Sequence, residues 1–227
     1  MQNLIFQYYI PYPNDTNKPD WVDIGTTSAK SYAEKINSEY IFSEKKVLPK
    51  SINVFETLRI IFDKEYDKYD KIFLLDIDTI VNTSENIFDI PIKDVAMVHE
   101  LGVYNRPAVP GASFTPDFWH RYFYDPHSGV ISYAQKYLNR NFQWRKPHLY
   151  PNEQFALYNG GVQVWSKQGR LKARELFNPT MHDHFYYTTR KGETPYLNML
   201  FFHHNFELTE LDNSWNRLNF QWAVDNN

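Results

Sequence analysis

Residues 71–79 read KIFLLDIDT, an apolar run that leads directly into two aspartates, Asp76 and Asp78. The KIFLL part is typical of a strand buried on both faces, as in a parallel sheet covered by helices. In α/β sheets the carboxyl ends of strands point into the ligand crevice. Two carboxylates at such an end can share one hard cation and leave room for an anionic ligand. We therefore expect a divalent-metal site here, the alternative being that both aspartates only cap the turn by binding its amides.

Apolar patterns on both sides of this strand predict alternating strands and helices. We expect strands at residues 4–10, 40–42, 95–98 and 162–165, and helices at 26–40, 52–62, 129–138, 167–177 and 193–202. Thr26 or Thr27 would cap the first helix and Ser51 the second. Residues 207–227 are expected to be irregular. The order β-α-β-α-β in the first 80 residues predicts an α/β sandwich with a mostly parallel sheet.

The composition excludes several classes of protein. The chain has 227 residues, a formal net charge of −3 and no cysteine, so disulfides, thiolate nucleophiles and cysteine-based metal sites are excluded. Its eight glycines form neither a G-x-G fingerprint nor a Walker A loop. The charge gives no attraction to nucleic acid or an anionic membrane. Neither a signal peptide nor a membrane span is recognisable, so we expect one cytoplasmic domain, 1–227.

Four segments, in order along the chain, resemble the metal-dependent glycosyltransferases of the GT-A fold, specifically the galactosyltransferase and glycogenin-type enzymes of glycosyltransferase family 8. Residues 69–81 resemble the metal-site segment of that family, and YNGGV at 158–162 resembles its Phe-Asn-Ala/Ser-Gly-Val strand entry. ETPYLN at 193–198 resembles Asp-Gln-Asp-x-Leu-Asn, and LDNSWN at 211–216 resembles Leu-x-x-x-Tyr/Trp-Asn. The resemblance covers roughly residues 1–217. It implies a single GT-A-like domain with three α/β/α layers and a mixed, mostly parallel sheet.

The resemblance also implies a donor site in residues 1–100. The donor would be a nucleotide-sugar, most simply a UDP-sugar, and Asp76 and Asp78 would hold Mn²⁺ or Mg²⁺ on its diphosphate. Arg59 would assist through an ion pair with Asp76 or the diphosphate, for which its planar fork is suited. The nucleoside would contact residues after the first strand: Tyr8, Tyr12 and Asp15.

Residues 101–227 would bind the acceptor, a glycan or another hydroxyl compound, with the aromatic-rich stretch 119–150 as its platform. Five residues would face the reacting sugar: Asn159, Gly160, Gly161, Glu193 and Thr194. Asn159 supplies both donor and acceptor groups to hydroxyls, and the two glycines would let the sugar approach the backbone.

Two departures from the family leave alternatives open. Thr194 stands where the family has glutamine, and no histidine segment like the family's C-terminal metal ligand precedes Asn227. The resemblance favours retention of configuration at the transferred sugar. The alternatives are a metal-dependent phosphohydrolase that uses the same two aspartates and an inactive descendant that binds sugar or nucleotide without turnover.

Overall fold

The computed structural model describes residues 2–11, 17–48, 52–99, 136, 158–178, 181–189 and 192–216. The chain forms two compact units. Unit 1 contains residues 1–96, 161–179 and 207–209, and unit 2 contains residues 97–160, 180–206 and 210–227. Several predictions lie outside the described residues: the cap at Ser51, the helix at 129–138, the aromatic stretch 119–150, and the nucleoside contacts of Tyr12 and Asp15.

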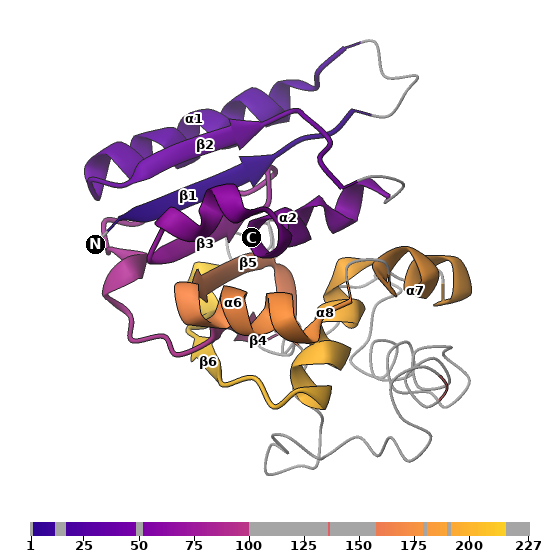
Figure 1. Cartoon of the computed structure of the whole chain (residues 1–227). Coiled ribbons are helices and arrows are strands. Elements are labelled where there is room, and N and C mark those ends of the chain that lie inside the picture. The colour runs from indigo at the N-terminus through magenta and orange to yellow at the C-terminus, as the bar shows by residue number, and fades with distance from the viewer. Residues whose placement is uncertain are drawn as a thin grey trace, which may run out of the picture. The chain divides into compact units, whose positions relative to one another are not determined.

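Strands and helices alternate over the described residues up to 99, and three helices follow one another between residues 167 and 203 (Figure 1). The strands are β1 (Asn3–Tyr8), β2 (Glu39–Ser43), β3 (Lys71–Leu75), β4 (Val95–His99), β5 (Tyr158–Ser166) and β6 (Leu208–Leu211). The α-helices are α1 (Asp20–Lys35), α2 (Arg59–Phe62), α6 (Lys167–Leu176), α7 (Met181–Thr189) and α8 (Glu193–His203). Short 3-10 helices are η1 (Asn53–Leu58), η2 (Lys64–Lys68), η3 (Ile87–Asp89) and η4 (Asn213–Trp215). No described helix has both the length and the apolar composition needed to cross a bilayer.

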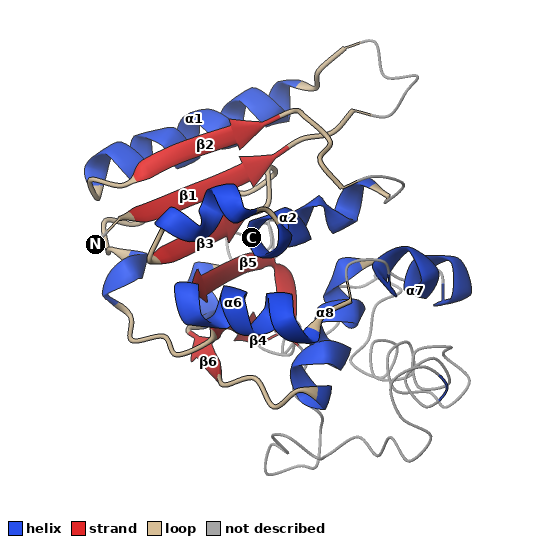
Figure 2. Cartoon of the chain, viewed as in Figure 1, coloured by secondary structure: helices blue, strands red, loops and turns tan. Residues whose placement is uncertain are grey.

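The strands form one sheet in the order β2-β1-β3-β5-β4-β6, drawn in red in Figure 2. Strand β1 lies between β2 and β3 and pairs with both in parallel, while β3 pairs with β5 in antiparallel orientation. The sheet is therefore mixed, as predicted. Helix α1 provides the long crossover that a parallel β1–β2 connection requires.

Helices cover both faces of the sheet in unit 1. Ile5 is aligned with Phe73 in the β1–β3 register, so Phe6 and Phe73 point to opposite faces. Tyr32 of α1 packs edge-on against Phe73, at 6.4 Å between ring centroids. Tyr66 of η2 packs edge-on against Phe6, at 5.4 Å. This arrangement gives the three α/β/α layers expected, with the apolar β3 buried between them.

Helix α1 differs from its prediction at both ends. It begins at Asp20 rather than at Thr26, and Pro19 occupies the N-cap position with extended backbone. Acidic side chains in the first turn, including Asp20, interact favourably with the positive end of the helix dipole, which compensates for a missing side-chain cap. The helix ends at Lys35 instead of continuing to residue 40, because Asn37 adopts a positive φ of 53° and the chain turns into β2.

Three further differences concern short elements. Residues 53–62 form η1 followed by one turn of α2 rather than one continuous helix. The stretch from 207, expected to be irregular, contains β6 and η4. Helix α7 was not predicted, because its aromatic residues stand side by side at 185–187 and give no helical periodicity.

Candidate functional site

Asp76 and Asp78 lie in the turn that follows β3, and hydrogen bonds fix the backbone of this turn. The Asp76 amide donates to the carbonyl of Gly161 in β5 at 2.8 Å. The Asp76 carbonyl accepts from the Gln7 side chain of β1 at 3.1 Å and from the Thr79 amide at 3.1 Å. Both strands that flank β3 therefore hold the position at which the first aspartate leaves the sheet.

Helix α1 packs against the same turn. A Cβ atom placed on Gly25 would lie only 1.9 Å from the carbonyl oxygen of Ile77, the residue between the two aspartates. One turn later along the helix, Ser28 accepts a hydrogen bond from the Val81 amide at 2.9 Å. The turn therefore packs so closely against α1 that only glycine, which has no Cβ atom, fits at position 25.

The two carboxylates fit a hard divalent cation. Asp76 is half-buried and Asp78 is exposed. Within the described part of the chain, no three histidine, aspartate or glutamate side chains gather as a potential metal centre. Mg²⁺ needs no such cage, because it is commonly bound by one or two carboxylates together with substrate phosphates and water. Asp76 and Asp78 are two carboxylates at the end of a strand that could meet this requirement.

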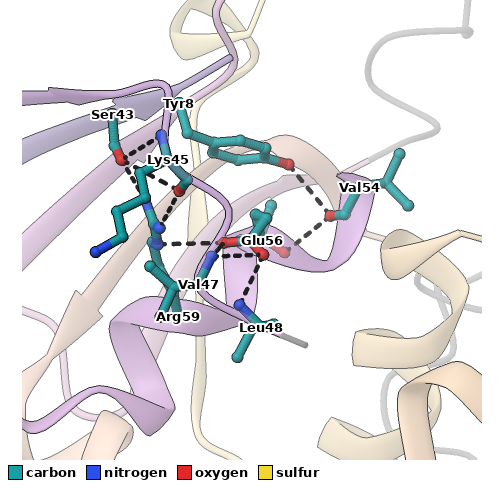
Figure 3. Close-up of polar contacts among 9 residues, drawn as sticks. Tyr8, Ser43, Lys45, Val47, Leu48, Val54, Glu56 and Arg59 are labelled. Carbon is teal, nitrogen blue, oxygen red and sulfur yellow. Dashed lines mark hydrogen bonds and ion pairs between the residues drawn. The ribbon is translucent and has the colours of Figure 1, made fainter. Parts of the chain in front are cut away.

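Arg59 is buried, with 1% of its surface exposed, and Figure 3 shows its contacts. Its guanidinium donates to the Ser43 hydroxyl at 2.6 Å and to the carbonyl of Lys45. Its Nε atom lies 3.3 Å from a carboxylate oxygen of Glu56. Of the two partners expected for Arg59, Asp76 is therefore not among its described contacts, and its carboxylate partner is Glu56.

Glu56 is the centre of this arrangement, which we call the Glu56–Arg59 network. Its fully buried carboxylate accepts from the Leu48 amide at 2.8 Å and from the Val47 amide at 3.1 Å. Tyr8, at the end of β1, donates its hydroxyl to the carbonyl of Val54 at 3.2 Å. The network holds Ser43, the last residue of β2, and the segment 45–48 that follows it (Figure 3). A glutamate and an arginine three residues apart inside an apolar run, NVFETLRI, are the sequence signal that could have identified it.

A second group of predicted residues lies in unit 2. A Cβ atom on Gly160 would lie 2.3 Å from the Thr194 hydroxyl and 2.9 Å from a carboxylate oxygen of Glu193. The space that this glycine leaves is therefore filled by the first turn of α8, rather than open to a sugar as expected. Thr194 donates to the Glu193 carboxylate at 3.1 Å. Burial raises the pKa of Glu193, although hydrogen bonds from its own amide and from Thr194 act in the opposite direction.

Two asparagines, visible in the sequence only as parts of motifs, organise this group. Asn198, buried in α8, accepts from the Tyr158 amide at 2.9 Å and donates to the carbonyls of Tyr158 and Thr194, both at 2.8 Å. Asn216 donates to the side-chain carbonyl of Asn159 at 2.7 Å. These bonds join the start of β5, the first turn of α8 and the end of η4 within unit 2.

The described site residues therefore fall into three sets. Asp76 and Asp78 share one turn, which the Gly161 carbonyl holds through the Asp76 amide. Arg59 belongs to the Glu56–Arg59 network, and Tyr8 contacts Val54 in η1. The third set lies together in unit 2: Asn159, Gly160, Glu193 and Thr194.

The raised pKa of Glu193 predicts a specific dependence of stability on pH. Because the folded state binds this proton more tightly than the unfolded state, the contribution is complete below the ordinary value of 4.5 and is lost as pH rises through the raised pKa. Glu193→Gln cannot ionise. We expect its melting temperature relative to wild type to increase between pH 4 and pH 8, measured by scanning calorimetry. The exposed Glu175→Gln is the control, and an equal response from both variants would contradict the assignment.

Comparison with known proteins identifies the fold of the chain. Neither a protein-family model nor a curated protein sequence matches the chain. The solved structure of a glycosyltransferase involved in the glycosylation of the major capsid of PBCV-1 aligns with a TM-score of 0.51 at 12% identity, covering 94% of this chain and 83% of that one. The galactosyltransferase LgtC, in complex with donor and acceptor sugar analogs, aligns with a TM-score of 0.49 at 13% identity, covering 98% and 78%. The first alignment establishes the fold, which confirms the predicted GT-A-like α/β class.

Proposed function

We propose that this chain, which has a fold found in glycosyltransferases, transfers a hexose from a nucleotide-sugar to a hydroxyl group of a glycan or another acceptor. The observation that carries the proposal is the Asp76-Ile77-Asp78 turn at the carboxyl end of β3. A fold of this kind can host unrelated functions, so the argument depends on the site rather than on the architecture. Two carboxylates at the end of a buried strand are the chemistry that a metal-bound diphosphate requires.

Asp76 and Asp78 would hold Mn²⁺ or Mg²⁺ against the donor diphosphate. A cation bound there neutralises the charge that develops on the leaving nucleotide. The protein contributes a fixed geometry, since Asp76 leaves the sheet with both its backbone groups hydrogen-bonded, to Gly161 on one side and to Gln7 on the other. A UDP-sugar is the donor that the resemblance favours.

Asn159 and Glu193 would bind the sugar. The Asn159 amide and the Glu193 carboxyl group can each hydrogen-bond a sugar hydroxyl. In the transfer, the bond from the anomeric carbon to the phosphate oxygen breaks and a bond to the acceptor oxygen forms. We favour retention, with the acceptor proton passing to the departing phosphate oxygen on the same face of the sugar.

Thermal shift with nucleoside diphosphates tests this function. Wild type is compared with Asp78→Asn in the presence of UDP, GDP, CDP or dTDP, each with Mn²⁺ or with EDTA. A ligand at about 100 times its Kd adds about 2.7 kcal/mol, which raises the melting temperature of a chain of this size by about 5–10 °C. We expect this rise for one diphosphate, with metal only, and we expect Asp78→Asn to lose it.

Asp89→Asn is the matched control, because it removes an exposed carboxylate from η3, next to the start of β3 rather than its end. It should keep the metal-dependent shift. A wild type that no nucleotide stabilises would contradict donor binding, and release of phosphate from simple esters would then support the phosphohydrolase. A shift that survives EDTA and Asp78→Asn would contradict the metal site and support an inactive nucleotide-binding protein.

A further inference from the structure

Gln7, near the carboxyl end of β1, has a fully buried side chain whose two polar ends are both hydrogen-bonded. Its Nε2 atom donates to the carbonyl oxygen of Asp76 at 3.1 Å, and its Oε1 atom accepts from the Tyr40 hydroxyl at 2.9 Å. A backbone carbonyl can only accept a hydrogen bond, so the NH₂ end of the Gln7 amide must face Asp76. The Oε1 end therefore faces Tyr40, whose hydroxyl has to donate.

The strand register brings Tyr40 to Gln7. Ile5 of β1 is aligned with Tyr40 of β2, and Gln7 lies two positions further along β1. Residues two apart on a strand share a face, and diagonal neighbours on adjacent strands are within reach of long side chains. Burial raises the pKa of Tyr40 to about 12, so its hydroxyl keeps the proton that it donates near neutral pH. Strands β2, β1 and β3 lie side by side (Figure 1), so the two side chains connect β2 through β1 to the turn after β3.

The carbonyl that Gln7 binds belongs to the peptide group between Asp76 and Ile77, inside the aspartate turn. Because a peptide group is planar, a hydrogen bond to its carbonyl restrains the whole plane. This plane connects the backbone of Asp76 to the residue before Asp78, so its rotation would change the direction of one carboxylate relative to the other. Without the Tyr40 hydroxyl, the buried Oε1 atom of Gln7 would lose its donor, and the side chain would move to reduce that cost and loosen its bond to Asp76.

We propose that Tyr40 and Gln7 form a positioning pair that fixes the peptide between Asp76 and Ile77, and thereby the relative directions in which Asp76 and Asp78 present their carboxylates to a divalent cation. This inference rests on the proposed function and deepens it, because it adds two residues that act without contacting the cation or the donor. It also makes metal affinity depend on β2, a strand that contains neither aspartate.

Tyr40→Phe removes only the hydroxyl and keeps the aromatic ring. We expect its affinity for Mn²⁺ to fall about tenfold, the lower end of the range for residues that hold a metal ligand in position. Gln7→Met, which has a similar length and shape but no amide, should lose at least as much. Because both changes break the same connection, the double variant should bind Mn²⁺ no more weakly than Gln7→Met alone. Titration with Mn²⁺ in the presence of UDP, GDP, CDP or dTDP, followed by paramagnetic resonance of the free ion, measures the affinity.

Tyr32→Phe is the matched control, because it also removes a tyrosine hydroxyl that donates a hydrogen bond, here to the carbonyl of Glu85 at 2.8 Å. It should lower the melting temperature but keep the Mn²⁺ affinity of wild type. If Tyr40→Phe and Gln7→Met bind Mn²⁺ as wild type does, or if Tyr32→Phe weakens binding equally, the positioning role is overturned while the proposed function stands. If wild type binds no Mn²⁺ with any of the four nucleotides, the proposed function fails and the positioning role fails with it.

A measurement without metal or nucleotide tests the contact itself. The amide of Ile77 belongs to the peptide that Gln7 restrains, so its resonance in a ¹H–¹⁵N correlation spectrum reports on that peptide. Tyr40→Phe and Gln7→Met should both shift this resonance, and Tyr32→Phe should not. An Ile77 resonance that stays at its wild-type position in the first two variants would overturn the inference whatever the metal data.

Discussion

Replacing Gly25 with alanine is expected to destabilise the fold and to abolish metal-dependent nucleotide binding. The new Cβ would lie 1.9 Å from the carbonyl oxygen of Ile77 and 3.0 Å from its carbonyl carbon, and neither backbone atom can rotate away. Helix α1 and the Asp76-Ile77-Asp78 turn must therefore separate. Overpacking of this kind costs about 1–3 kcal/mol, or about 2–12 °C of melting temperature. The two carboxylates would then no longer be held in place, and the nucleotide-induced shift measured with Mn²⁺ should disappear.

Gly169→Ala is the control that separates the two effects. Gly169 also lies in a helix against a backbone carbonyl, and a Cβ atom added to it would lie only 2.1 Å from the oxygen of Asp94. Both glycines belong to unit 1, but Asp94 is not part of the aspartate turn. Gly169→Ala should lower the melting temperature to a similar extent and keep the metal-dependent shift. Equal loss of the shift in both variants would mean that general destabilisation, rather than displacement of the turn, accounts for the result.

The elements that could be predicted from the sequence are those that the residues within the element itself determine. KIFLL is apolar without interruption, and such a run forms a buried strand in almost any α/β context, so β3 lies at the predicted residues 71–75. The close packing of Gly25 against the aspartate turn could not be predicted in this way, because it depends on a contact with a distant segment. Nothing in the residues around it indicates that the backbone of residue 77 will lie against it, and the helix was expected to begin one residue later.

The candidate site shows the same division. Asp76 and Asp78 could be identified from their position after a strand, and Asn159, Glu193 and Thr194 from motifs that resemble a family. The partners of these residues could not. Asn216 reaches Asn159 across 57 positions, and a hydrogen bond at that separation depends on the completed fold. For Arg59, the sequence suggested an ion pair with Asp76, whereas the described carboxylate partner is Glu56. Which of the two carboxylates lies beside Arg59 depends on the packing of the folded chain, where Glu56 is buried next to it.

That buried pair has an energetic consequence independent of the proposed chemistry. Glu56 is 0% and Arg59 1% exposed, so both charges have lost their hydration. Each is compensated by the other and by hydrogen bonds: two backbone amides for the carboxylate, and a hydroxyl and a carbonyl for the guanidinium. Removing one partner leaves the other charge buried without its counter-ion, which is far more costly than the net stabilisation that the intact pair provides.

Glu56→Ala should therefore lower the free energy of unfolding by about 3–5 kcal/mol, or the melting temperature by about 6–20 °C, in chemical and thermal denaturation. Glu56→Gln should lose less, because its amide oxygen can still accept from Val47 or Leu48 while the charge on Arg59 stays uncompensated. The double variant Glu56→Leu/Arg59→Met should recover part of the loss, since it removes both charges but leaves the backbone groups of residues 45–48 without partners.

Glu34→Ala, which removes an exposed carboxylate from α1, is the control and should change the melting temperature little. If Glu56→Ala melts as high as Glu34→Ala, the carboxylate does not hold residues 43–48 in the folded protein. If the double variant melts below Glu56→Ala, then hydrogen bonds rather than the unpaired charge on Arg59 account for the loss.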